Sequence, residues 1–195
     1  MRGYRPLAIP ECNSTGCHAH EKSELMTYRY CPQCATPLVT GEIAGLSRRY
    51  CPASGCGFVH YVNPLPVACC LVQHKGGIVL IRRGVVPRLG YWALPSGFVE
   101  AHETTEEAAR RETREECGLD VAIGELLGVT TFVAPPPQPN AVGLFYLSHA
   151  VGGTLGAGDD TTDARVFPLD ALPDELAFAS HGHYLGLLRA RLRRT

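Results

Sequence analysis

The sequence has no long hydrophobic run and no excess of charge of either sign. No apolar stretch approaches the roughly 20 residues that a helix needs to cross a bilayer, and the N-terminus has no basic region followed by a hydrophobic one. The formal net charge is −1 at pH 7, so the broad basic surface that non-specific binding to nucleic acid or membranes requires is missing. These absences predict a soluble, cytoplasmic protein and leave small anionic molecules as candidate substrates.

The composition nevertheless supports a folded chain. Of the 195 residues, 45% are hydrophobic, which suits one medium-sized domain with its own core and a small appendage. Residues 1–28 show neither periodicity nor an apolar run, so we predict a poorly ordered extension there. This extension contains four potential metal ligands, Cys12, Cys17, His18 and His20. Scattered cysteines and histidines in a polar tail more often bind no metal.

Two pairs of cysteines follow. Cys31 and Cys34 enclose two residues, and after a gap of sixteen residues Cys51 and Cys56 enclose four. Each pair can form a tight turn that presents thiolates to one tetrahedral ion, and four thiolates leave no open position for catalysis. The pattern resembles a zinc ribbon over residues 29–62 with a structural Zn²⁺, although its second pair is longer than the usual Cys-x-x-Cys. The alternative is a set of buried free thiols.

The chain beyond the cysteines alternates between strand and helix patterns. Cys69 and Cys70 lie within an apolar strand, where they are expected to be small core residues. The proline run at residues 134–139 is stiff, and forms either one wall of a pocket or a rigid surface loop. The periodicity predicts strands at 66–73, 78–82, 126–133, 141–149 and 165–167, and a C-terminal helix at 178–193.

Carboxylates gather between Gly97 and Leu119. Thr104 and Glu107 have the spacing of a capping box, in which each residue bonds the backbone N–H of the other. Gly118 is suited to the left-handed position that follows a last helical turn. The sequence therefore predicts a helix over residues 105–117.

On this helix Glu112, Glu115 and Glu116 occupy one face. Like charges at this spacing repel each other by about 0.2–0.5 kcal/mol per pair. A hard divalent ion would relieve the repulsion, because Mg²⁺ prefers oxygen ligands and is usually shared between carboxylates and the phosphates of a substrate. The alternative is a solvated surface helix on which Glu107 pairs with Arg111.

The loop in front of the helix adds further residues at fixed spacing. The full set is Gly97, Glu103, Arg111-Glu112, Glu115-Glu116 and Gly118-Leu119. These residues resemble the Nudix box in full spacing, with one departure, since Thr113 stands where the family usually has a bulky aliphatic residue. The resemblance covers about residues 30–193 and implies the Nudix fold, an α/β/α sandwich with a mixed sheet over residues 63–195.

The resemblance implies a metal site. Glu112, Glu115 and Glu116 would hold Mg²⁺ or Mn²⁺, and the carbonyl of Gly97 would be a further ligand. This ion is the catalytic cofactor that the resemblance implies, whereas the Zn²⁺ of the ribbon would be structural.

The resemblance also implies residues that support the metal site. It casts Arg111 and Glu103 as residues that orient the helix and the loop before it. The base that activates water would be one of the box glutamates, or Asp160 or Asp163 in the loop that precedes the last strand. For the two aspartates, a solvated acidic turn is the alternative.

Candidate contacts to the substrate lie on both sides of the box. Arg82, Arg83 and Arg88 have the charge to meet a diphosphate, although lone arginines are as often solvated. Aromatic walls for the ends of the substrate are sought in Tyr91, Trp92 and Phe132.

The reaction that the resemblance implies is Mg²⁺-dependent hydrolysis of a nucleoside diphosphate linked to another moiety. Ribbon-bearing family members of the NADH pyrophosphatase and RNA-decapping group carry a Ser-Gln-Pro-Trp signature after the box, and this chain has none. The resemblance therefore favours FAD or ADP-ribose as the substrate, giving AMP plus FMN or ribose 5-phosphate. The alternatives are NADH pyrophosphatase or RNA-decapping activity, and a non-catalytic Nudix domain that senses a ligand. The expected partner is a small molecule, with no membrane and no nucleic acid, and a homodimer is left open.

Overall fold

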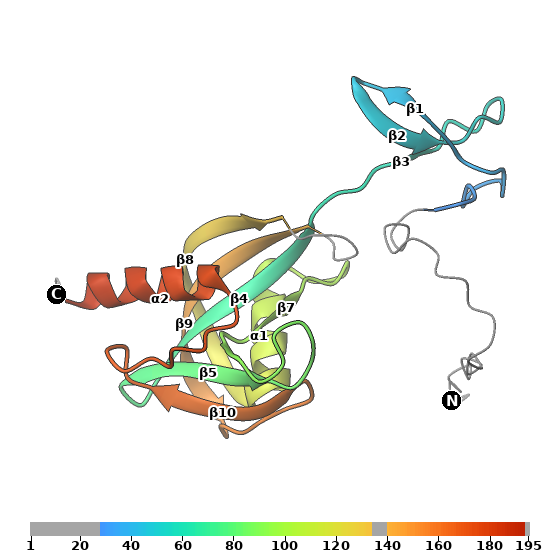
Figure 1. Ribbon diagram of the computed structural model, residues 1–195. Coiled ribbons are helices and arrows are strands. Elements are labelled where there is room, and N and C mark those ends of the chain that lie inside the picture. The colour runs from blue at the N-terminus through green and yellow to red at the C-terminus, as the bar shows by residue number, and fades with distance from the viewer. Residues whose placement is uncertain (1–27, 134–139, 194–195) are drawn as a thin grey trace, which may run out of the picture. The chain divides into compact units, whose positions relative to one another are not determined.

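A computed structural model describes residues 28–133 and 140–193 of the chain. It divides into two compact units, and the boundary between them lies between Val62 and Asn63 (Figure 1). The predicted extension up to residue 27, with its Cys12, Cys17, His18 and His20 group, lies outside the described residues, as does the proline run at 134–139. Within the described ranges, no helix is long and apolar enough to span a membrane.

The smaller unit is a three-stranded antiparallel sheet of β1 (Val39–Ile43), β2 (Leu46–Tyr50) and β3 (Val59–His60). Its apolar core is small, and two of its three buried residues are cysteines: Cys31, Leu38 and Cys51. A core of this size buries too little apolar surface to hold a unit together by itself.

The four predicted zinc ligands meet in this unit. The Sγ atoms of Cys31, Cys34, Cys51 and Cys56 all lie within 4.8 Å of one another. The longer second pair closes because Gly55 takes a left-handed conformation, with φ 79°. Four thiols at this separation form a sulfur donor set of the kind that holds structural Zn²⁺. The cluster fits the zinc ribbon that the cysteine spacing predicts.

The larger unit contains a seven-stranded sheet in the order β10-β5-β4-β9-β8, with β6 paired to β5 and β7 paired to β4. The pairing of β4 with β9 is parallel and the other pairings are antiparallel, so the sheet is mixed as predicted. Its elements are β4 (Leu65–His74), β5 (Gly77–Arg83), β6 (Trp92–Ala93), β7 (Ser96–Phe98), α1 (Thr105–Cys117), β8 (Leu119–Phe132), β9 (Ala141–Gly153), β10 (Thr161–Phe167) and α2 (Ala179–Leu192).

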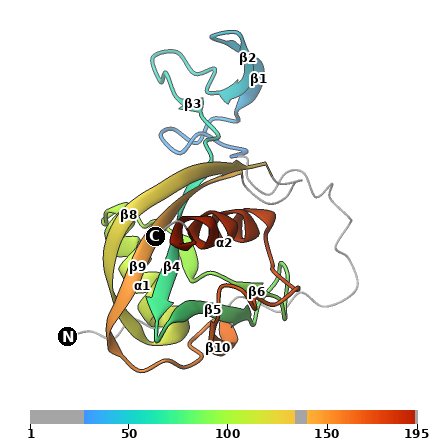
Figure 2. The same cartoon turned by 90° about the vertical axis from the view of Figure 1, so that its left-hand side faces the viewer.

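The two helices cover opposite faces of this sheet (Figures 1 and 2). Successive residues of a strand point to opposite faces, and β4 shows the division: Ala68 and Cys70 belong to the core cluster that contains α1, whereas Cys69 and Leu71 belong to the cluster that contains α2. Both faces of β4 are buried, which explains its almost continuous apolar run. The architecture is the predicted α/β/α sandwich.

Two strands are longer than their apolar patterns indicate. β8 begins at Leu119, seven residues before the predicted start at Leu126, because the chain absorbs Gly124 and Glu125 in a register shift between Ile123 and Leu126 instead of ending the strand there. β10 begins at Thr161 instead of Arg165. Its first residues are polar because it is an edge strand with one side open.

Helix α2 brings a buried histidine against the sheet. His181 is 2% exposed, and its Nδ1 accepts a hydrogen bond of 3.0 Å from the backbone N–H of Leu94. The ring meets Phe145 and Phe178 edge-on. Burial, aided by the nearby charge of Arg83, lowers the pKa of His181 to about 3, so the imidazole is neutral around pH 7.

The first prediction concerns zinc in the smaller unit. Protein purified without added metal should contain one Zn²⁺ per chain, and the Cys31→Ser/Cys34→Ser variant should lose it, because two thiolates cannot close the coordination shell. Elemental analysis measures both. The matched control is Cys69→Ala, which removes a thiol outside the cluster and should keep the zinc. Equal zinc in the wild-type and double-serine proteins would exclude the ribbon site.

The second prediction concerns stability at acid pH. The folded-state pKa of His181, about 3, lies below the ordinary value of about 6.5, so the unfolded chain binds the proton more tightly. The stability that this histidine contributes is therefore complete above about pH 6.5 and falls as the pH drops towards 3, by at most about 1.4 kcal/mol per pH unit. Denaturant unfolding at several pH values should show a shallower slope for His181→Asn, which cannot titrate. Parallel profiles would contradict the assignment.

Candidate active site

Helix α1 has the start and the end that its sequence predicts. The side chain of Thr104 accepts a hydrogen bond from the N–H of Glu107, and the carboxylate of Glu107 accepts one from the N–H of Thr104. Gly118 follows the last turn with φ 73°, and its N–H bonds the carbonyl of Arg114. These caps fix where the helix begins and ends, and therefore which face its carboxylates occupy.

Arg111 gathers the carboxylates of the box. Its guanidinium contacts both oxygens of Glu103, at 2.6 and 3.1 Å, and reaches Glu112 at 2.6 Å and Glu115 at 3.1 Å. It also donates to the carbonyl of Phe98, at 3.0 Å. The arginine thus ties α1 to the loop before it.

The charges of this network are strongly coupled. The Arg111 guanidinium, with a hydrogen bond from the N–H of Glu100, holds the pKa of Glu103 at about 2. The carboxylates, Glu103 first among them, raise the pKa of Arg111. The pairing of Glu107 with Arg111 that a solvated surface helix would show is not formed, because Glu107 is engaged in the capping box. This carboxylate face is therefore an organised charge network.

Gly97 lies directly against the carboxylate of Glu112. A Cβ atom at Gly97 would come within 2.0 Å of the Glu112 carboxyl carbon, so any side chain would displace that carboxylate. Gly97 pairs with Ala68 between β7 and β4, which holds its backbone in place. Burial raises the pKa of Glu112. The close approach explains why glycine is required here.

Glu116 is the most buried carboxylate of the set, with 8% of the residue exposed. Its Oε2 accepts a hydrogen bond of 2.8 Å from the N–H of Ser96. Burial raises its pKa to about 8, and the neighbouring charges of Glu112 and Asp160 add to that effect. A buried carboxylate among other acids is stabilised by a hard cation, so these oxygen donors suit the implied Mg²⁺ or Mn²⁺.

The three predicted ligands do not meet at one point. Glu112 and Glu115 both turn towards Arg111, whereas Glu116 turns towards Ser96. Among residues 28–133 and 140–193, the cysteine cluster is the one group of three or more potential ligands whose donor atoms come within 4.8 Å of each other. The sequence therefore places the three acids on one helix. In the structure, two of their side chains bond the Arg111 guanidinium and the third bonds the Ser96 N–H.

The loop before β10 is bonded to the end of α1. The N–H groups of Gly158 and Asp159 bond the carbonyls of Glu116 and Glu115, at 3.1 and 3.3 Å, and the Thr161 hydroxyl bonds the carbonyl of Glu116 at 2.9 Å. A Cβ at Gly158 would lie 1.7 Å from the Glu115 carbonyl oxygen. Gly158 and Thr161 were not predicted from the sequence, because nothing in their local sequence reveals a partner over 40 residues away.

The two candidate aspartates differ in their surroundings. Asp160 is exposed, and it stands between Asp159 and Thr161, which bond the carbonyls of Glu115 and Glu116 at the end of α1. Asp163 forms an ion pair of 2.6 Å with Arg165 on the same strand. The structure therefore brings Asp160 to the box and engages Asp163 elsewhere.

The arginines differ in the same way. Arg82 donates to the carbonyl of Gly90 at 2.8 Å, and Arg88 lies over the ring of Tyr91. Arg83 donates to the carbonyl of Pro87 at 2.8 Å and lies over the ring of Phe178, and its positive charge lowers the pKa of both Glu116 and His181. Of these three arginines, Arg83 is the one whose charge acts on the pKa of a carboxylate of α1, Glu116.

The predicted aromatic walls are unequal. Trp92 is 8% exposed and packs edge-to-face on Phe167 with ring centroids 4.8 Å apart, so it contributes to the core and offers no open face. Phe132 is half-buried and lies against Gly143 and Phe145. Tyr91 is partly exposed, with 37% of its surface accessible.

Thr113, the departure from the box, fits its site without strain. It is fully buried, and its hydroxyl donates to the carbonyl of Ala109 at 2.7 Å. The thiol of Cys70 contacts the same carbonyl, and the thiol of Cys117 bonds the carbonyl of Thr113. The hydroxyl is satisfied within the helix, so the substitution leaves the carboxylate face intact.

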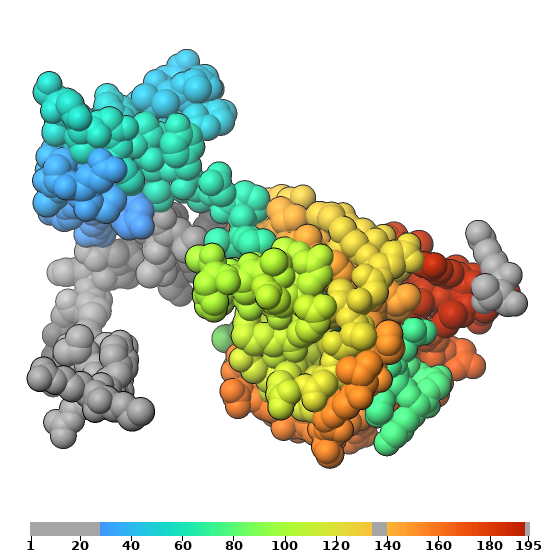
Figure 3. Space-filling view, turned by 180° about the vertical axis from the view of Figure 1, so that it is seen from behind, coloured from blue at the N-terminus to red at the C-terminus, as the bar shows by residue number. Residues whose placement is uncertain are grey.

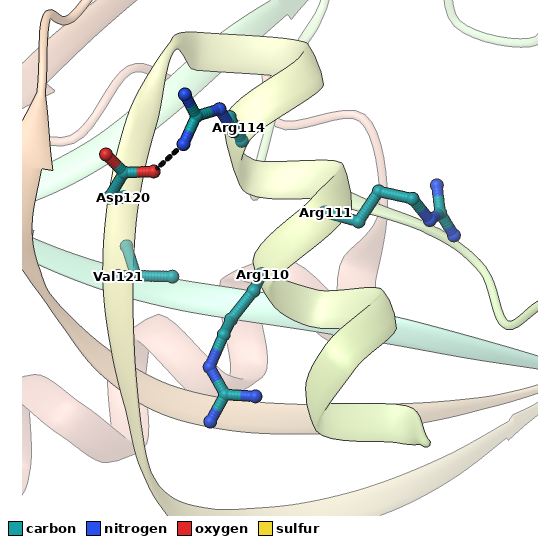
Figure 4. A pocket seen from close by; sticks show the side chains of 5 residues that line it. All are labelled: Arg110, Arg111, Arg114, Asp120 and Val121. Carbon is teal, nitrogen blue, oxygen red and sulfur yellow. Dashed lines mark hydrogen bonds and ion pairs between the residues drawn. The ribbon is translucent and has the colours of Figure 1, made fainter. Parts of the chain in front are cut away.

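Figure 3 shows α1 and the loop before it, in yellow-green, on the surface of the larger unit. A hollow borders α1 beside Arg114 and Asp120, which form an ion pair (Figure 4). In this view Arg111 points to the opposite side of the helix from Arg110 and Arg114. The hollow is lined by Arg110, Arg111, Arg114, Asp120 and Val121.

Comparison with curated proteins finds two kinds of relative. The chain is 39% identical over 118 residues to an ADP-ribose pyrophosphatase of Methanocaldococcus jannaschii, covering 60% of this chain and 69% of the relative. It is 34% identical over 149 residues to the NAD-capped RNA hydrolase NudC of Chromobacterium violaceum, covering 75% of this chain and 52% of the relative. The chain thus spans about half the length of that relative.

Solved structures and family membership agree with the fold. A NUDIX hydrolase from Nitrosomonas europaea superposes with a TM-score of 0.72 at 28% identity, covering 81% of this chain and 88% of that one. A MutT NUDIX hydrolase from Burkholderia pseudomallei superposes with a TM-score of 0.56 at 30% identity, covering 64% and 97%. The NUDIX domain family matches residues 62–187. The chain therefore belongs to the Nudix family of hydrolases.

Proposed function

We propose that this chain is an Mg²⁺- or Mn²⁺-dependent pyrophosphatase that hydrolyses a nucleoside diphosphate linked to a second group, with ADP-ribose and FAD as its preferred substrates. The observation that carries the proposal is the complete charge network around Arg111, together with the buried carboxylate of Glu116 on the Ser96 N–H. The ADP-ribose pyrophosphatase relative, at 39% identity, supports ADP-ribose as the first substrate to test.

Each residue of the network has a distinct part in the proposed reaction. Glu112, Glu115 and Glu116 would hold the divalent ion, with the Gly97 carbonyl as a further ligand, and the bound ion would neutralise charge on the phosphoryl oxygens. Arg111 and Glu103 keep α1 and the preceding loop in register. Arg83 adds positive charge near Glu116, where it would attract a diphosphate.

The base takes a proton from the attacking water. The water oxygen bonds to one phosphorus atom while the bond from that phosphorus to the bridging oxygen breaks, so ADP-ribose gives AMP and ribose 5-phosphate. Asp160 is favoured over Asp163 for this role because Asp163 is paired with Arg165 and Asp160 lies near Glu116. A box glutamate is the competing base.

A second candidate function is hydrolysis of NADH or of NAD-capped RNA. The NudC relatives favour it, since one of them aligns with 75% of this chain, and they make RNA a substrate to be tested. The missing Ser-Gln-Pro-Trp signature opposes it. A ligand-sensing domain without activity is opposed by the intact carboxylate network.

The ribbon and the location of the protein belong to the same proposal. The four clustered cysteines would hold a structural Zn²⁺, which closes its shell and takes no part in hydrolysis. The thiols of Cys69, Cys70 and Cys117 form no disulfide bond. This suits the reducing cytoplasm that we propose as the site of action.

The third prediction tests the carboxylates. Glu115→Gln and Glu116→Gln should each lower kcat by about a hundredfold or more, because each removes negative charge from the metal site while the amide keeps the shape of the side chain. Melting temperatures should change little, since the repulsion on the helix face is also relieved. The matched control is Glu106→Gln, an exposed acid of the first turn outside the network. Near-normal turnover in both variants would refute the proposed active site.

The fourth prediction tests the substrate. With Mg²⁺ present, the chain should cleave ADP-ribose and FAD faster than NADH or a nucleoside triphosphate at equal concentrations, and chromatography should show AMP as the common product. NAD-capped RNA is included as a fifth substrate. A marked preference for NADH, the capped RNA or the triphosphate would overturn the substrate assignment and leave the metal site standing.

A further inference from the structure

The segment before α2 is paired with β6, the short strand that leads to the box. Trp92 donates its N–H to the carbonyl of Glu175 at 2.9 Å, and its carbonyl accepts from the N–H of Ala177 at 2.8 Å. This is one step of a parallel ladder. In a continued ladder, the N–H of Leu94 would next bond the carbonyl of Ala177.

The imidazole of His181 takes the place of that carbonyl. The chain leaves the extended conformation and enters α2 at Ala179, and the N–H of Leu94 bonds His181 Nδ1 instead. Both Leu94 and His181 are buried. A buried N–H without a partner is costly, so the ring is the acceptor on which this backbone group depends.

The bond defines the state of the ring. A nitrogen that accepts a hydrogen bond carries no proton, so His181 is the neutral tautomer with its proton on Nε2. Among the described residues, the charged group that opposes protonation of His181 is the guanidinium of Arg83 on β5, and burial acts in the same direction. The ring is thus maintained as an acceptor.

The short connection from Leu94 to Gly97 also contacts two carboxylates of the candidate active site. Leu94 stands two residues before Ser96, whose N–H binds Glu116 at 2.8 Å, and three residues before Gly97, which lies against Glu112. The Ser96 hydroxyl bonds back to the Leu94 carbonyl at 3.2 Å. A shift of Leu94 would therefore be passed to both carboxylates.

We infer that His181 is a positioning residue for the metal site: from the opposite face of the sheet, its Nδ1 holds the Leu94–Gly97 connection at the place where Ser96 and Gly97 meet Glu116 and Glu112. The inference rests on the proposed metal-dependent hydrolysis. It assigns a function to a buried histidine that contacts neither substrate nor metal.

The experiment compares three variants of the full-length, zinc-loaded chain. His181→Phe keeps a planar ring and removes the acceptor, His181→Asn keeps an oxygen acceptor close to the position of Nδ1, and His183→Phe changes the exposed histidine of the same helix. The readouts are kcat, KM and the Mg²⁺ concentration for half-maximal rate, measured on whichever of the five test substrates the wild-type chain cleaves fastest.

His181→Phe should lower kcat by about a hundredfold, the effect of a misplacement of about 1 Å at a reacting centre, and should need more Mg²⁺. His181→Asn should recover most of the rate, and His183→Phe should match the wild type. Unchanged kinetics in His181→Phe, or equal losses in His181→Phe and His181→Asn, would overturn the positioning role. Such a result would leave the proposed function intact if the wild type is active.

A measurement on the wild-type chain covers the case in which a variant does not fold or the wild type cleaves no test substrate. Mg²⁺ is titrated while NMR follows the backbone amides of Leu94 and Ser96 and the ring nitrogens of His181 and His183. We expect Leu94, Ser96 and His181 to shift with one common midpoint and His183 to stay unchanged. A shift of the Ser96 signal without shifts of Leu94 and His181 would show that a change at the metal site does not reach His181 through this connection. That result would refute the inference.

Discussion

The carboxylate face of α1 depends on one cation placed among like charges. Glu112 and Glu115 lie on one face of α1, where they repel each other, and the Arg111 guanidinium contacts both of them and also Glu103 in the preceding loop. Without this arginine, the helix and the loop would each present unneutralised acids to the other. The arginine therefore offsets the repulsion between these carboxylates and fixes their orientation.

Close backbone approaches supply the second constraint. Gly97 leaves room for the Glu112 carboxylate, and Gly158 lets the loop before β10 bond the last carbonyls of α1. Side chains at these two positions would push the loops away from the helix. The two glycines thus let β7 and the loop before β10 approach the C-terminal half of α1, which contains Glu116.

The sheet connects this site to its other face. β4 separates the clusters that contain α1 and α2, yet the connection from β6 to β7 receives a bond from each side, through Ser96 to Glu116 and through Leu94 to His181. Because protein interiors are close-packed, a displacement of this connection cannot be absorbed locally. The C-terminal helix is in this way bonded to the connection that contacts the carboxylates of the box.

The sequence by itself determined the elements whose causes are local. The capping box at Thr104 and Glu107, the left-handed Gly118 and the carboxylate spacing on α1 depend on neighbours within a few turns of the chain, and the same holds for the cysteine pairs of the ribbon. The strand starts at Leu119 and Thr161 were misjudged because register shifts and edge pairing are set by the partner strand.

Tertiary structure alone decided the long-range contacts. The Ser96 bond to Glu116, the Gly158 approach to Glu115 and the His181 bond to Leu94 join residues 20, 43 and 87 positions apart. It also decided that Trp92 is buried while Tyr91 is partly exposed. Such outcomes depend on which faces of helix and sheet meet in three dimensions, and a one-dimensional pattern carries no direct record of that meeting.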